Sequence, residues 1–356
     1  MAKILKYQKT RETPLRVENA VGALSVELGD ALEKYEHWPS PTAIVSDGPY
    51  GLAKFPGDPQ SEESLGEWYA PHMAAWSKKA LPETTLWFWC SEVGWAEVHP
   101  VLKLHGWRYK AGHIWDKGIG HVAGNCNGDT IRGFPVVSEI CVQYVRDVQF
   151  RDSDGHPCSM KSWLRGEWLR SGLPLTKTNE ACGVRNAATR KYFTQCHLWY
   201  FPPPEKMEEL ARYANLHGCK TDKPYFSLDG KTPLTASQWF KMRPKWNHVH
   251  GVTNVWQEPA VRGRERIRRK GLKSLHANQK PLKLMERIIE SSTDAGDVVW
   301  EPFGGLCSAT VAALRIGRSC YAAEVLPEYF DVAVERIDRE RRENVIYEQK
   351  PNAKAS

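Results

Sequence analysis

The sequence predicts an α/β fold built from two strand–helix–strand units, with a further segment inserted between them. One unit begins with the apolar run 42–46 and the other with the run 296–300, and each run stops at a loop of acidic, proline and glycine residues. A buried strand that ends in a functional loop has this pattern. With 356 residues, the chain is long enough for one domain of catalytic size and an insertion.

The composition is that of a folded protein outside the membrane. Hydrophobic residues make up 41% of the chain and charged residues 26%, and the 15 Trp residues argue against disorder. The longest apolar stretches, 86–90 and 311–314, are far shorter than the roughly 18 residues that a transmembrane helix needs. Residues 1–14 lack the apolar segment of a secretory signal, so we expect a cytoplasmic protein without membrane association.

The nine cysteines are an odd number and include no CxxC pair, so we expect reduced thiols. Five Cys and His residues fall in one region without the spacing of metal ligands, namely Cys182, Cys196, His197, His217 and Cys219. We therefore expect no metal site.

The first unit continues from its strand into a helix and a second strand. Apolar residues recur near every 3.6 positions within 64–81, which predicts a helix; they are Leu65, Trp68, Tyr69, Met73 and Trp76. Residues 84–90 (TTLWFWC) predict a buried strand. Further strands over 108–115 and 138–145 flank a loop rich in Gly and Asn, 117–133, which is long enough to be functional.

The second unit has the layout of a nucleotide site. Its strand 296–300 runs into E-P-F-G-G at 301–305, a helix over 308–314 and a strand over 319–323 follow, and Glu324 ends that strand. Glycines after a strand allow a cofactor to approach backbone N–H groups, and an acid at the end of the next strand can accept both ribose hydroxyls. A tight turn alone would also use these glycines, but Glu324 in register favours a cofactor that carries a nucleoside.

The excess positive charge lies in the middle of the chain. Residues 151–250 hold 16 Lys and Arg against 9 Asp and Glu, which accounts for the whole net charge of +7. A dense basic run follows, which contains Arg262, Arg264, Arg266, Arg268, Arg269 and Lys270 and only Glu265 against them. This distribution indicates a polyanionic partner, although a solvated surface would also account for a charge cluster alone.

Three segments form a joint signature. They are S-D-G-P-Y-G at 46–51 with Gly29-Asp30 upstream, H-A-N-Q-K-P at 276–281 with Leu284 after it, and the loop 297–305 followed by Gly317-Arg318 and Glu324. Together they resemble the beta class of DNA amino-methyltransferases: the first is similar to the catalytic D-P-P-Y motif and the other two to the cofactor site. The resemblance covers roughly 24–145 and 252–340.

The order of the motifs agrees with this class, because the catalytic motif precedes the cofactor motif and the basic stretch lies where the class inserts its target-recognition region. The resemblance implies a Rossmann-like methyltransferase mixed sheet with helices on both faces and a mainly helical insertion. It places the catalytic domain at 18–150 and 251–345, the target-recognition region at 151–250, and tails at 1–17 and 346–356.

The sequence departs from the family pattern at two places. Gly48 replaces the first proline of the catalytic motif, and residues 306–309 (LCSA) stand where the family usually has a second glycine followed by Ser or Thr. The family uses a backbone carbonyl at the first position, so glycine preserves that group but holds the loop less rigidly. The second departure lies where the family binds the methionine part of its cofactor, S-adenosylmethionine.

The resemblance implies a catalytic loop of Asp47, Gly48, Pro49 and Tyr50. An exocyclic base amine is a poor nucleophile, because its lone pair is delocalised into the ring. The Asp47 carboxylate and the Gly48 carbonyl can accept its two protons and aim the lone pair at the methyl group of S-adenosylmethionine. Since the amine lies inside a duplex, the base must be flipped out, and Tyr50 is placed to stack on it. Ordinary packing of Tyr50 in the loop is the alternative.

The resemblance further assigns the residues that bind the cofactor and DNA. The cofactor residues are Asp30, His276, Asn278, Lys280, Glu301, Pro302, Phe303, Gly304, Gly305 and Glu324. The DNA-binding residues are Arg185, Asn186, Arg190, Lys191, Arg262, Arg264, Arg266, Arg268 and Arg269. The first four follow a turn at Gly183-Val184 that loosely resembles a helix-turn-helix, and a further amphipathic helix is predicted over 205–216.

The expected cofactor is S-adenosylmethionine, and the expected partner is double-stranded DNA in a prokaryote or phage. A cognate restriction endonuclease and a second copy of this chain are further candidate partners. Asp47 favours adenine N6 as the target over cytosine N4, whose enzymes more often carry Ser at this position. Two other interpretations stay open: a DNA-binding regulator on a degenerate methyltransferase scaffold, and an RNA methyltransferase.

Overall fold

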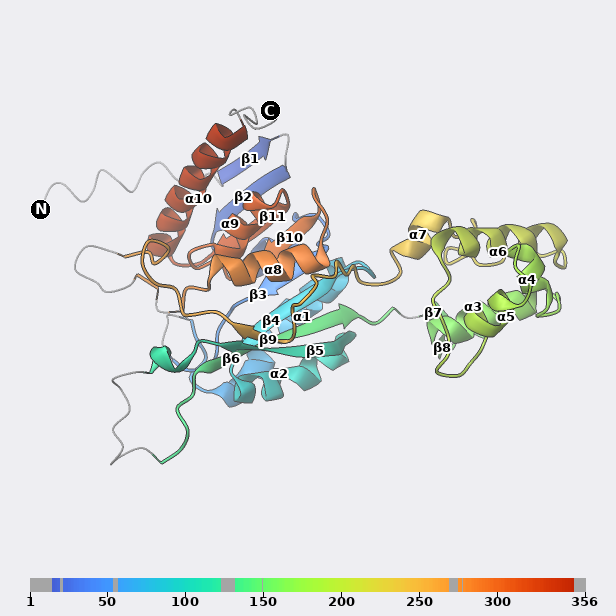
Figure 1. Ribbon diagram of the computed structural model, residues 1–356, viewed down its shortest axis with the longest axis horizontal. Coiled ribbons are helices and arrows are strands. Elements are labelled where there is room, and N and C mark those ends of the chain that lie inside the picture. Colours follow the sequence, from blue (N-terminus) through green and yellow to red (C-terminus); the bar gives the residue numbers. More distant parts are fainter. Residues whose placement is uncertain are drawn as a thin grey trace, which may run out of the picture. The chain divides into compact units, whose positions relative to one another are not determined.

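A computed structural model describes residues 15–19, 22–53, 57–122, 132–148, 150–268, 275–276 and 278–348. The chain forms two compact units (Figure 1). The larger unit consists of Met1–Arg146 together with Pro244–Ser356, and the smaller unit consists of Asp147–Arg243.

Within the described residues, nine strands of the larger unit form one mixed sheet in the order β1-β2-β11-β10-β3-β4-β6-β5-β9. Their bounds are β1 Leu15–Asn19, β2 Gly22–Leu28, β3 Ala43–Ser46, β4 Thr85–Cys90, β5 Trp107–Asp116, β6 Ser138–Arg146, β9 Val255–Gln257, β10 Val298–Glu301 and β11 Ser319–Glu324. The strands from β2 to β4 run parallel, whereas β1 pairs antiparallel with β2, and β6 pairs antiparallel with β4 and β5. The predicted mixed α/β sheet is confirmed.

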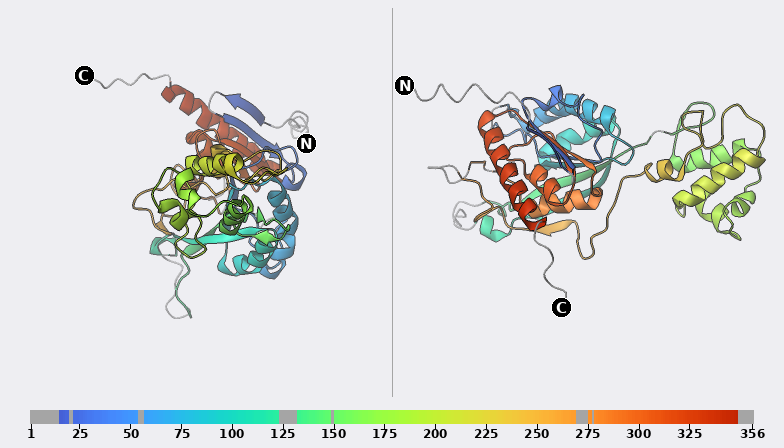
Figure 2. Two further views of the ribbon diagram at one scale, coloured as in Figure 1. Left: turned by 90° about the vertical axis from the view of Figure 1, so that its right-hand side faces the viewer. Right: turned by 90° about the horizontal axis from the view of Figure 1, so that it is seen from above.

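Helices cover both faces of this sheet (Figure 2). Their bounds are α1 Leu65–Lys79, α2 Glu92–Leu104, α8 Leu282–Ser292, α9 Ser308–Arg315 and α10 Pro327–Glu348, with short 3-10 helices η1 Ala31–Glu33, η2 Glu62–Ser64 and η3 Ile119–His121. β4 shows how one strand serves two cores: Trp87 and Trp89 pack with α8, α9 and α10, whereas Leu86, Phe88 and Cys90 pack with α1 and α2. Successive side chains of a strand point to opposite faces, so a strand buried on both faces has a continuous apolar sequence.

The two predicted units meet at the β3–β10 pair, where Val299 lies opposite Ala43 and Trp300 opposite Ile44. β3 leads into α1 on one face of the sheet, and β10 leads into α9 on the other. Connections that diverge from neighbouring parallel strands open a crevice at the carboxyl ends of those strands. The loops after β3 and β10, 255 residues of sequence apart from Ser46 to Glu301, therefore become neighbours.

The smaller unit has its own core and is mainly helical. Its elements are the hairpin β7 Phe150–Arg151 and β8 Pro157–Cys158, and the helices α3 Met160–Arg170, α4 Lys177–Ala181, α5 Ala187–Tyr192, α6 Pro204–His217 and α7 Ala236–Phe240. Trp163, Trp168 and Trp239 are buried in this core. The predicted turn at Gly183 lies between α4 and α5, and α6 covers the predicted helix 205–216.

Several predicted boundaries differ from the structure. β1 begins at Leu15, inside the segment predicted as a tail, and α10 continues to Glu348. The smaller unit ends at Arg243 rather than at residue 250, because Lys245 forms ion pairs with Asp294 and Asp297 of the larger unit. α2, α3 and α8 were not predicted from the sequence. Among the described residues, no helix is long and apolar enough to cross a membrane.

Candidate active site

A cavity of about 340 Å³ lies at the carboxyl ends of β3, β10 and β11. Every residue predicted for the catalytic loop and the cofactor site lines it: Asp30, Asp47, Gly48, Pro49, Tyr50, His276, Asn278, Lys280, Glu301, Pro302, Phe303, Gly304, Gly305 and Glu324. Three segments that are distant in sequence therefore share one cavity.

The catalytic loop begins directly after β3, whose four residues are all buried. Asp47 Oδ1 accepts hydrogen bonds from Lys280 Nζ at 2.7 Å and from the Tyr50 hydroxyl at 3.1 Å. Burial raises the pKa of Asp47, and the Lys280 ammonium opposes this increase. Both of these bonds end on Oδ1 and leave Oδ2 for a further donor.

Lys280 is bound by a second carboxylate, which the sequence analysis missed. Lys280 Nζ lies 3.2 Å from Glu139 Oε2, and Glu139 Oε1 lies 2.5 Å from Lys117 Nζ. Burial works to raise the pKa of Glu139, but the two ammonium groups lower it overall. A lone acid in the apolar run of β6 was the available signal for Glu139, since an acid is rarely buried without a partner. The predicted cofactor residue Lys280 thus contacts the catalytic loop.

Gly48 lies in a space that has no room for a side chain. A Cβ atom on Gly48 would lie 2.5 Å from the Tyr69 hydroxyl and 2.6 Å from Phe303 Cδ2. The same Tyr69 hydroxyl donates a hydrogen bond to the Pro49 carbonyl at 3.1 Å, and the Tyr69 side chain is fully buried. The departure from the family motif is therefore matched by an aromatic side chain of α1.

The loop after β10 packs closely against the end of β11. A Cβ on Gly304 would lie 2.9 Å from the Ala323 carbonyl oxygen, and Gly305 has a φ of +51°, which favours glycine. Glu324 Oε2 accepts the Gly305 N–H at 2.6 Å, and Oε1 accepts the Leu326 N–H at 2.8 Å. Burial raises the pKa of Glu324, and these backbone N–H groups oppose it. Each carboxylate oxygen keeps a lone pair for a further donor.

Glu301 faces the cavity but directs its carboxylate to a helix. Its Oε1 accepts the Ala309 N–H at 2.9 Å, and its Oε2 accepts the Thr310 N–H at 2.7 Å and the Thr310 hydroxyl at 2.6 Å. These amides belong to the first turn of α9, whose N-cap residue Cys307 provides no side-chain bond. Burial raises the pKa of Glu301 to about 7. These bonds cap the N-terminus of α9. The predicted contact of Glu301 with the cofactor stays a prediction.

The remaining predicted residues form the rim and floor of the cavity. His276 packs edge-on against Tyr329 at a ring distance of 5.1 Å, and burial lowers its pKa to about 4, so the imidazole is neutral. Asp30 Oδ1 caps η1 through the Leu32 N–H. Phe303 packs against Trp68 and His72, with ring distances of 5.6 and 5.0 Å, and forms an aromatic floor.

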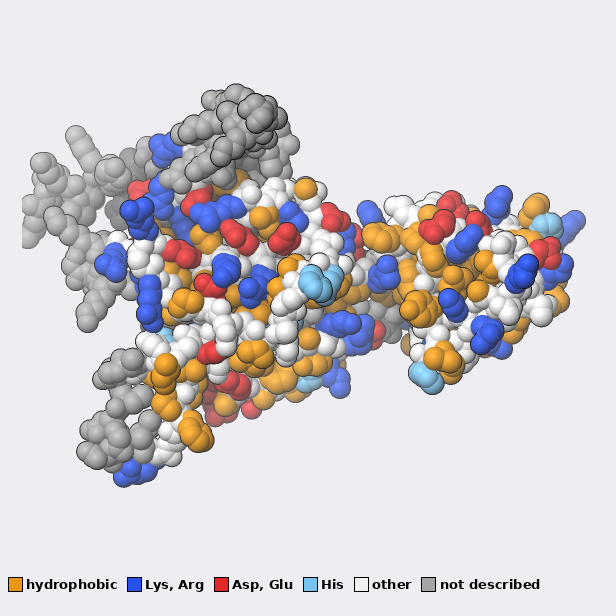
Figure 3. Space-filling model, viewed as in Figure 1, with side chains coloured by type: hydrophobic (Ala, Val, Ile, Leu, Met, Phe, Trp, Pro, Cys, Tyr) orange, Lys and Arg blue, Asp and Glu red, His pale blue; other side chains and the backbone are white. Residues whose placement is uncertain are grey.

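The predicted DNA-binding residues that the structure describes do not line this cavity. Arg185, Asn186, Arg190 and Lys191 are exposed on the smaller unit, where Lys and Arg side chains are spread between apolar ones (Figure 3). In the larger unit, Arg262, Arg264 and Arg268 are exposed and Arg266 is half-buried. Arg262 also donates to the Gly120 carbonyl at 3.2 Å. Arg269 lies outside the described residues.

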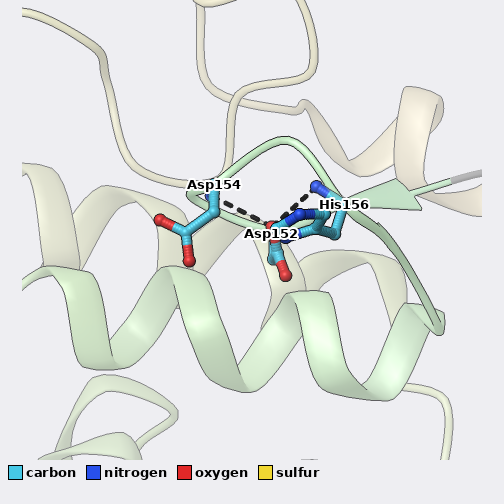
Figure 4. Close-up of side chains that lie close together, drawn as sticks. All are labelled: Asp152, Asp154 and His156. Carbon is cyan, nitrogen blue, oxygen red and sulfur yellow. Dashed lines mark hydrogen bonds and ion pairs between the residues drawn. The ribbon is translucent and has the colours of Figure 1, made fainter.

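One group of potential metal ligands occurs among the described residues, in the connection between β7 and β8 (Figure 4). It contains Asp152, Asp154 and His156, all exposed. Asp152 Oδ1 accepts the backbone N–H groups of Asp154 at 3.0 Å and of His156 at 2.9 Å. This is the pattern of an Asx turn, which accounts for the close approach of these residues without an ion.

Comparisons with known proteins identify relatives of this chain. A family model described as DNA methylase matches residues 42–335. The type II methyltransferase M.HinfI of Haemophilus influenzae is 36% identical over 134 residues, which are 36% of this chain and 34% of that protein. The DNA adenine methyltransferase YhdJ of Escherichia coli (strain K12) is 33% identical over 93 residues, which are 26% of this chain and 30% of that protein. The match thus spans about a third of the length of these curated relatives.

Among solved structures, the PvuII DNA methyltransferase (cytosine-N4-specific) is similar with a TM-score of 0.51. The similarity covers 89% of this chain and 91% of that chain, at 14% sequence identity. At this identity it concerns the fold, and it agrees with the mixed sheet and its two helical layers.

Proposed function

Because the chain belongs to the DNA methylase family, whose model it matches over residues 42–335, we propose that it is a site-specific DNA amino-methyltransferase that uses S-adenosylmethionine. The proposed target is the exocyclic amine of a flipped base, with adenine N6 favoured. The observation that carries the proposal is the shared cavity: Asp47 after β3 and Glu324 at the end of β11 line the same space.

The residues around the loop 301–305 suit a nucleoside that carries a sulfonium group. Gly304 and Gly305 allow close approach to the backbone, and Glu324 keeps acceptor capacity for ribose hydroxyls beside them. Phe303 and Trp68 provide an apolar surface for an aromatic ring. When bound, the cofactor would supply an electrophilic methyl group.

The catalytic loop would orient the amine. Asp47 Oδ2 and the Gly48 carbonyl would each accept one amine proton, which leaves the nitrogen lone pair directed at the methyl carbon. Transfer would replace the carbon–sulfur bond of the cofactor by a carbon–nitrogen bond, and the Asp47 carboxylate, which would hold one of the amine protons, would accept the proton that the amine releases. The side chain of Tyr50 lines the cavity and would stack on the flipped base.

The basic residues would hold the DNA. We assign target recognition to the smaller unit, through Arg185, Asn186, Arg190 and Lys191, and phosphate contacts to the run from Arg262 to Arg268. Arg and Asn can form bidentate contacts with base edges, whereas clustered cations favour phosphates. We also propose two candidate partners, a cognate restriction endonuclease and a second copy of this chain.

One experiment tests this function and the choice of base. The full chain is expressed in a host without DNA methyltransferases, and host DNA is read by single-molecule sequencing, which separates N6-methyladenine from N4-methylcytosine and reports their sequence context. The relative YhdJ is a DNA adenine methyltransferase, and this supports adenine as the expected result. If the sequencing detects N4-methylcytosine instead, cytosine is the target of the same mechanism. Unmodified DNA that the purified chain nevertheless binds would favour a non-catalytic regulator, and modified RNA alone would identify an RNA enzyme.

A further inference from the structure

The charged groups beside the catalytic loop form a neutral network of two carboxylates and two ammonium groups. Asp47 and Glu139 provide the negative charges, and Lys280 and Lys117 the positive ones. The network joins the loop after β3, the start of β6, the segment before α8 and the segment after β5. Asp47 and Lys280 are 233 residues apart in sequence.

Lys280 is the centre of this network. Its Nζ contacts Asp47 Oδ1 at 2.7 Å, the Tyr50 hydroxyl at 3.2 Å and Glu139 Oε2 at 3.2 Å. An ammonium group has three N–H donors; Asp47 and Tyr50 accept two of them, and Glu139 forms an ion pair with the same group. The side chain is only 2% exposed, and its charge also lies 5.4 Å from the centroid of the Tyr50 ring and 5.3 Å from that of the Trp89 ring.

We infer that Lys280 is a positioning residue, which holds the Asp47 carboxylate ionised and fixes the Tyr50 ring, while Glu139 holds Lys280 in place. The inference rests on the proposed function, because it concerns the two side chains that would meet the target base. One carboxylate oxygen of Asp47 is anchored by Lys280 and Tyr50, and the other is presented to the amine. A buried carboxylate without a cation nearby takes up a proton instead, and a protonated Asp47 is a weaker acceptor.

The titratable groups that interact with Asp47, or with its neighbours Glu139 and Lys280, come from every element around them. They are Tyr50 of the same loop, Tyr69 of α1, Cys90 of β4, Glu139 and Cys141 of β6, Lys117 after β5, and His276 and Lys280 of the segment before α8. Burial raises the pKa of Cys90 to about 12 and also raises the pKa of Cys141, while it lowers that of His276 to about 4. These three groups are therefore neutral at physiological pH. Lys280 is the cation in direct contact with Asp47.

Replacement of Lys280 by Met tests the inference through the pH profile. Without the ammonium, the pKa of Asp47 rises, so we expect single-turnover methylation to fall at least about tenfold near pH 6.5 and to recover as the pH approaches 9. The double variant Lys280→Met/Glu139→Gln removes the second carboxylate charge and should recover at lower pH than the single variant. It also restores a network of zero net charge, with one carboxylate and one ammonium, whereas Lys280→Met alone leaves two carboxylates against one ammonium.

Lys245→Met is the matched control. Lys245 also pairs with two carboxylates, at 2.6 Å from Asp297 and 2.9 Å from Asp294, but it does not line the cavity. Its pH profile should superimpose on that of the unmodified chain. A Lys280→Met profile that runs parallel to the wild-type profile, whether lower or equal, would overturn the inference.

A second measurement does not depend on activity and separates this inference from the proposed function. In Lys280→Met, Asp47 and Glu139 bind protons more tightly in the folded state than in the unfolded state, so the melting temperature should decrease more steeply between pH 5 and pH 9 than in the wild type. If the wild type methylates no nucleic acid, the proposed function fails, and this slope still decides whether Lys280 keeps the carboxylates ionised. An unchanged slope would refute that role.

Discussion

Tyr69 occupies the space that a side chain on Gly48 would need, and the Tyr69 hydroxyl is hydrogen-bonded to the carbonyl of the next residue, Pro49. In the family motif this position is a proline, which stiffens the loop by its ring. Here a buried phenol from α1 restrains the loop from the side. The catalytic loop of this chain therefore depends on a residue 20 positions beyond it.

Gly48→Ala should disrupt the loop, because its Cβ would lie 2.5 Å from the Tyr69 hydroxyl and 2.6 Å from Phe303. We expect methylation to fall more than about tenfold. The free energy of unfolding should fall by about 1–3 kcal/mol, because the added methyl group overpacks the site. Gly133→Ala is the control, since no atom lies within 4 Å of its Cβ position. In a Tyr69→Phe background the closest contact is gone, so the alanine should cost less there. Equal costs in both backgrounds, measured as a double-mutant cycle, would contradict this account.

Asp47→Asn should abolish methyl transfer and leave the affinity for the cofactor nearly unchanged. The amide has nearly the same shape as the carboxylate but loses the charge that draws electron density to the amine nitrogen. We expect the single-turnover rate to fall at least about 100-fold. The affinity for S-adenosylmethionine, measured by calorimetry, should change by less than about threefold, since Asp47 is placed at the amine and not at the ribose. Parallel loss of both would show that Asp47 belongs to the cofactor site.

Glu324→Gln should produce the opposite pattern. The loss of one charged acceptor beside Gly305 should weaken S-adenosylmethionine binding about 10- to 100-fold, while DNA affinity stays the same. Glu335→Gln, an exposed position on α10, serves as the control and should leave both affinities unchanged. If Glu324→Gln bound S-adenosylmethionine with wild-type affinity, Glu324 would not be a cofactor-binding residue.

Charge reversal at Arg266 and Arg268 tests the basic run. If these residues contact phosphates, the double variant Arg266→Glu/Arg268→Glu should bind DNA at least about tenfold more weakly at low salt, with a shallower dependence on salt concentration. Lys103→Glu places the same change on an exposed position of α2 and should have little effect. Equal binding by both variants would mean that the run is an ordinary solvated surface.

Glu301 makes stability depend on pH. Its folded-state pKa is about 7, above the unfolded value of 4.5, so the folded state binds the extra proton between these values. Stability from this group is present below about pH 4.5 and is lost as the pH rises through 7, by up to about 3 kcal/mol. Chemical unfolding at pH 5 and pH 8 should show this decrease, and Glu301→Gln should reduce it. A decrease of the same size in the variant would assign the slope to other groups.

Local pattern was enough to predict the elements that build the cavity. β3, α1, β4, β10, α9 and β11 lie within a few residues of their predicted ranges, because their periodicity and their turns are properties of short segments. The loops after β3 and β10 were located in the same way, and the resemblance to the DNA amino-methyltransferases implied their roles. α2, α3 and α8 were missed although their buried residues recur three and four positions apart, as Met285, Ile288 and Ile289 do in α8, so the helical signal was present in the sequence.

The sequence alone determined which chemical groups this chain brings to its cavity: Asp47, the glycines after β10 and Glu324 each follow a recognisable strand. Only the tertiary structure decided what each group touches, as Lys280 binds Asp47 and Glu139, Glu301 caps α9, and Tyr69 fills the space beside Gly48. The reason is physical: a strand or turn is encoded by neighbours in sequence, whereas a buried charge takes its partner from whichever strands and loops the sheet order places beside it.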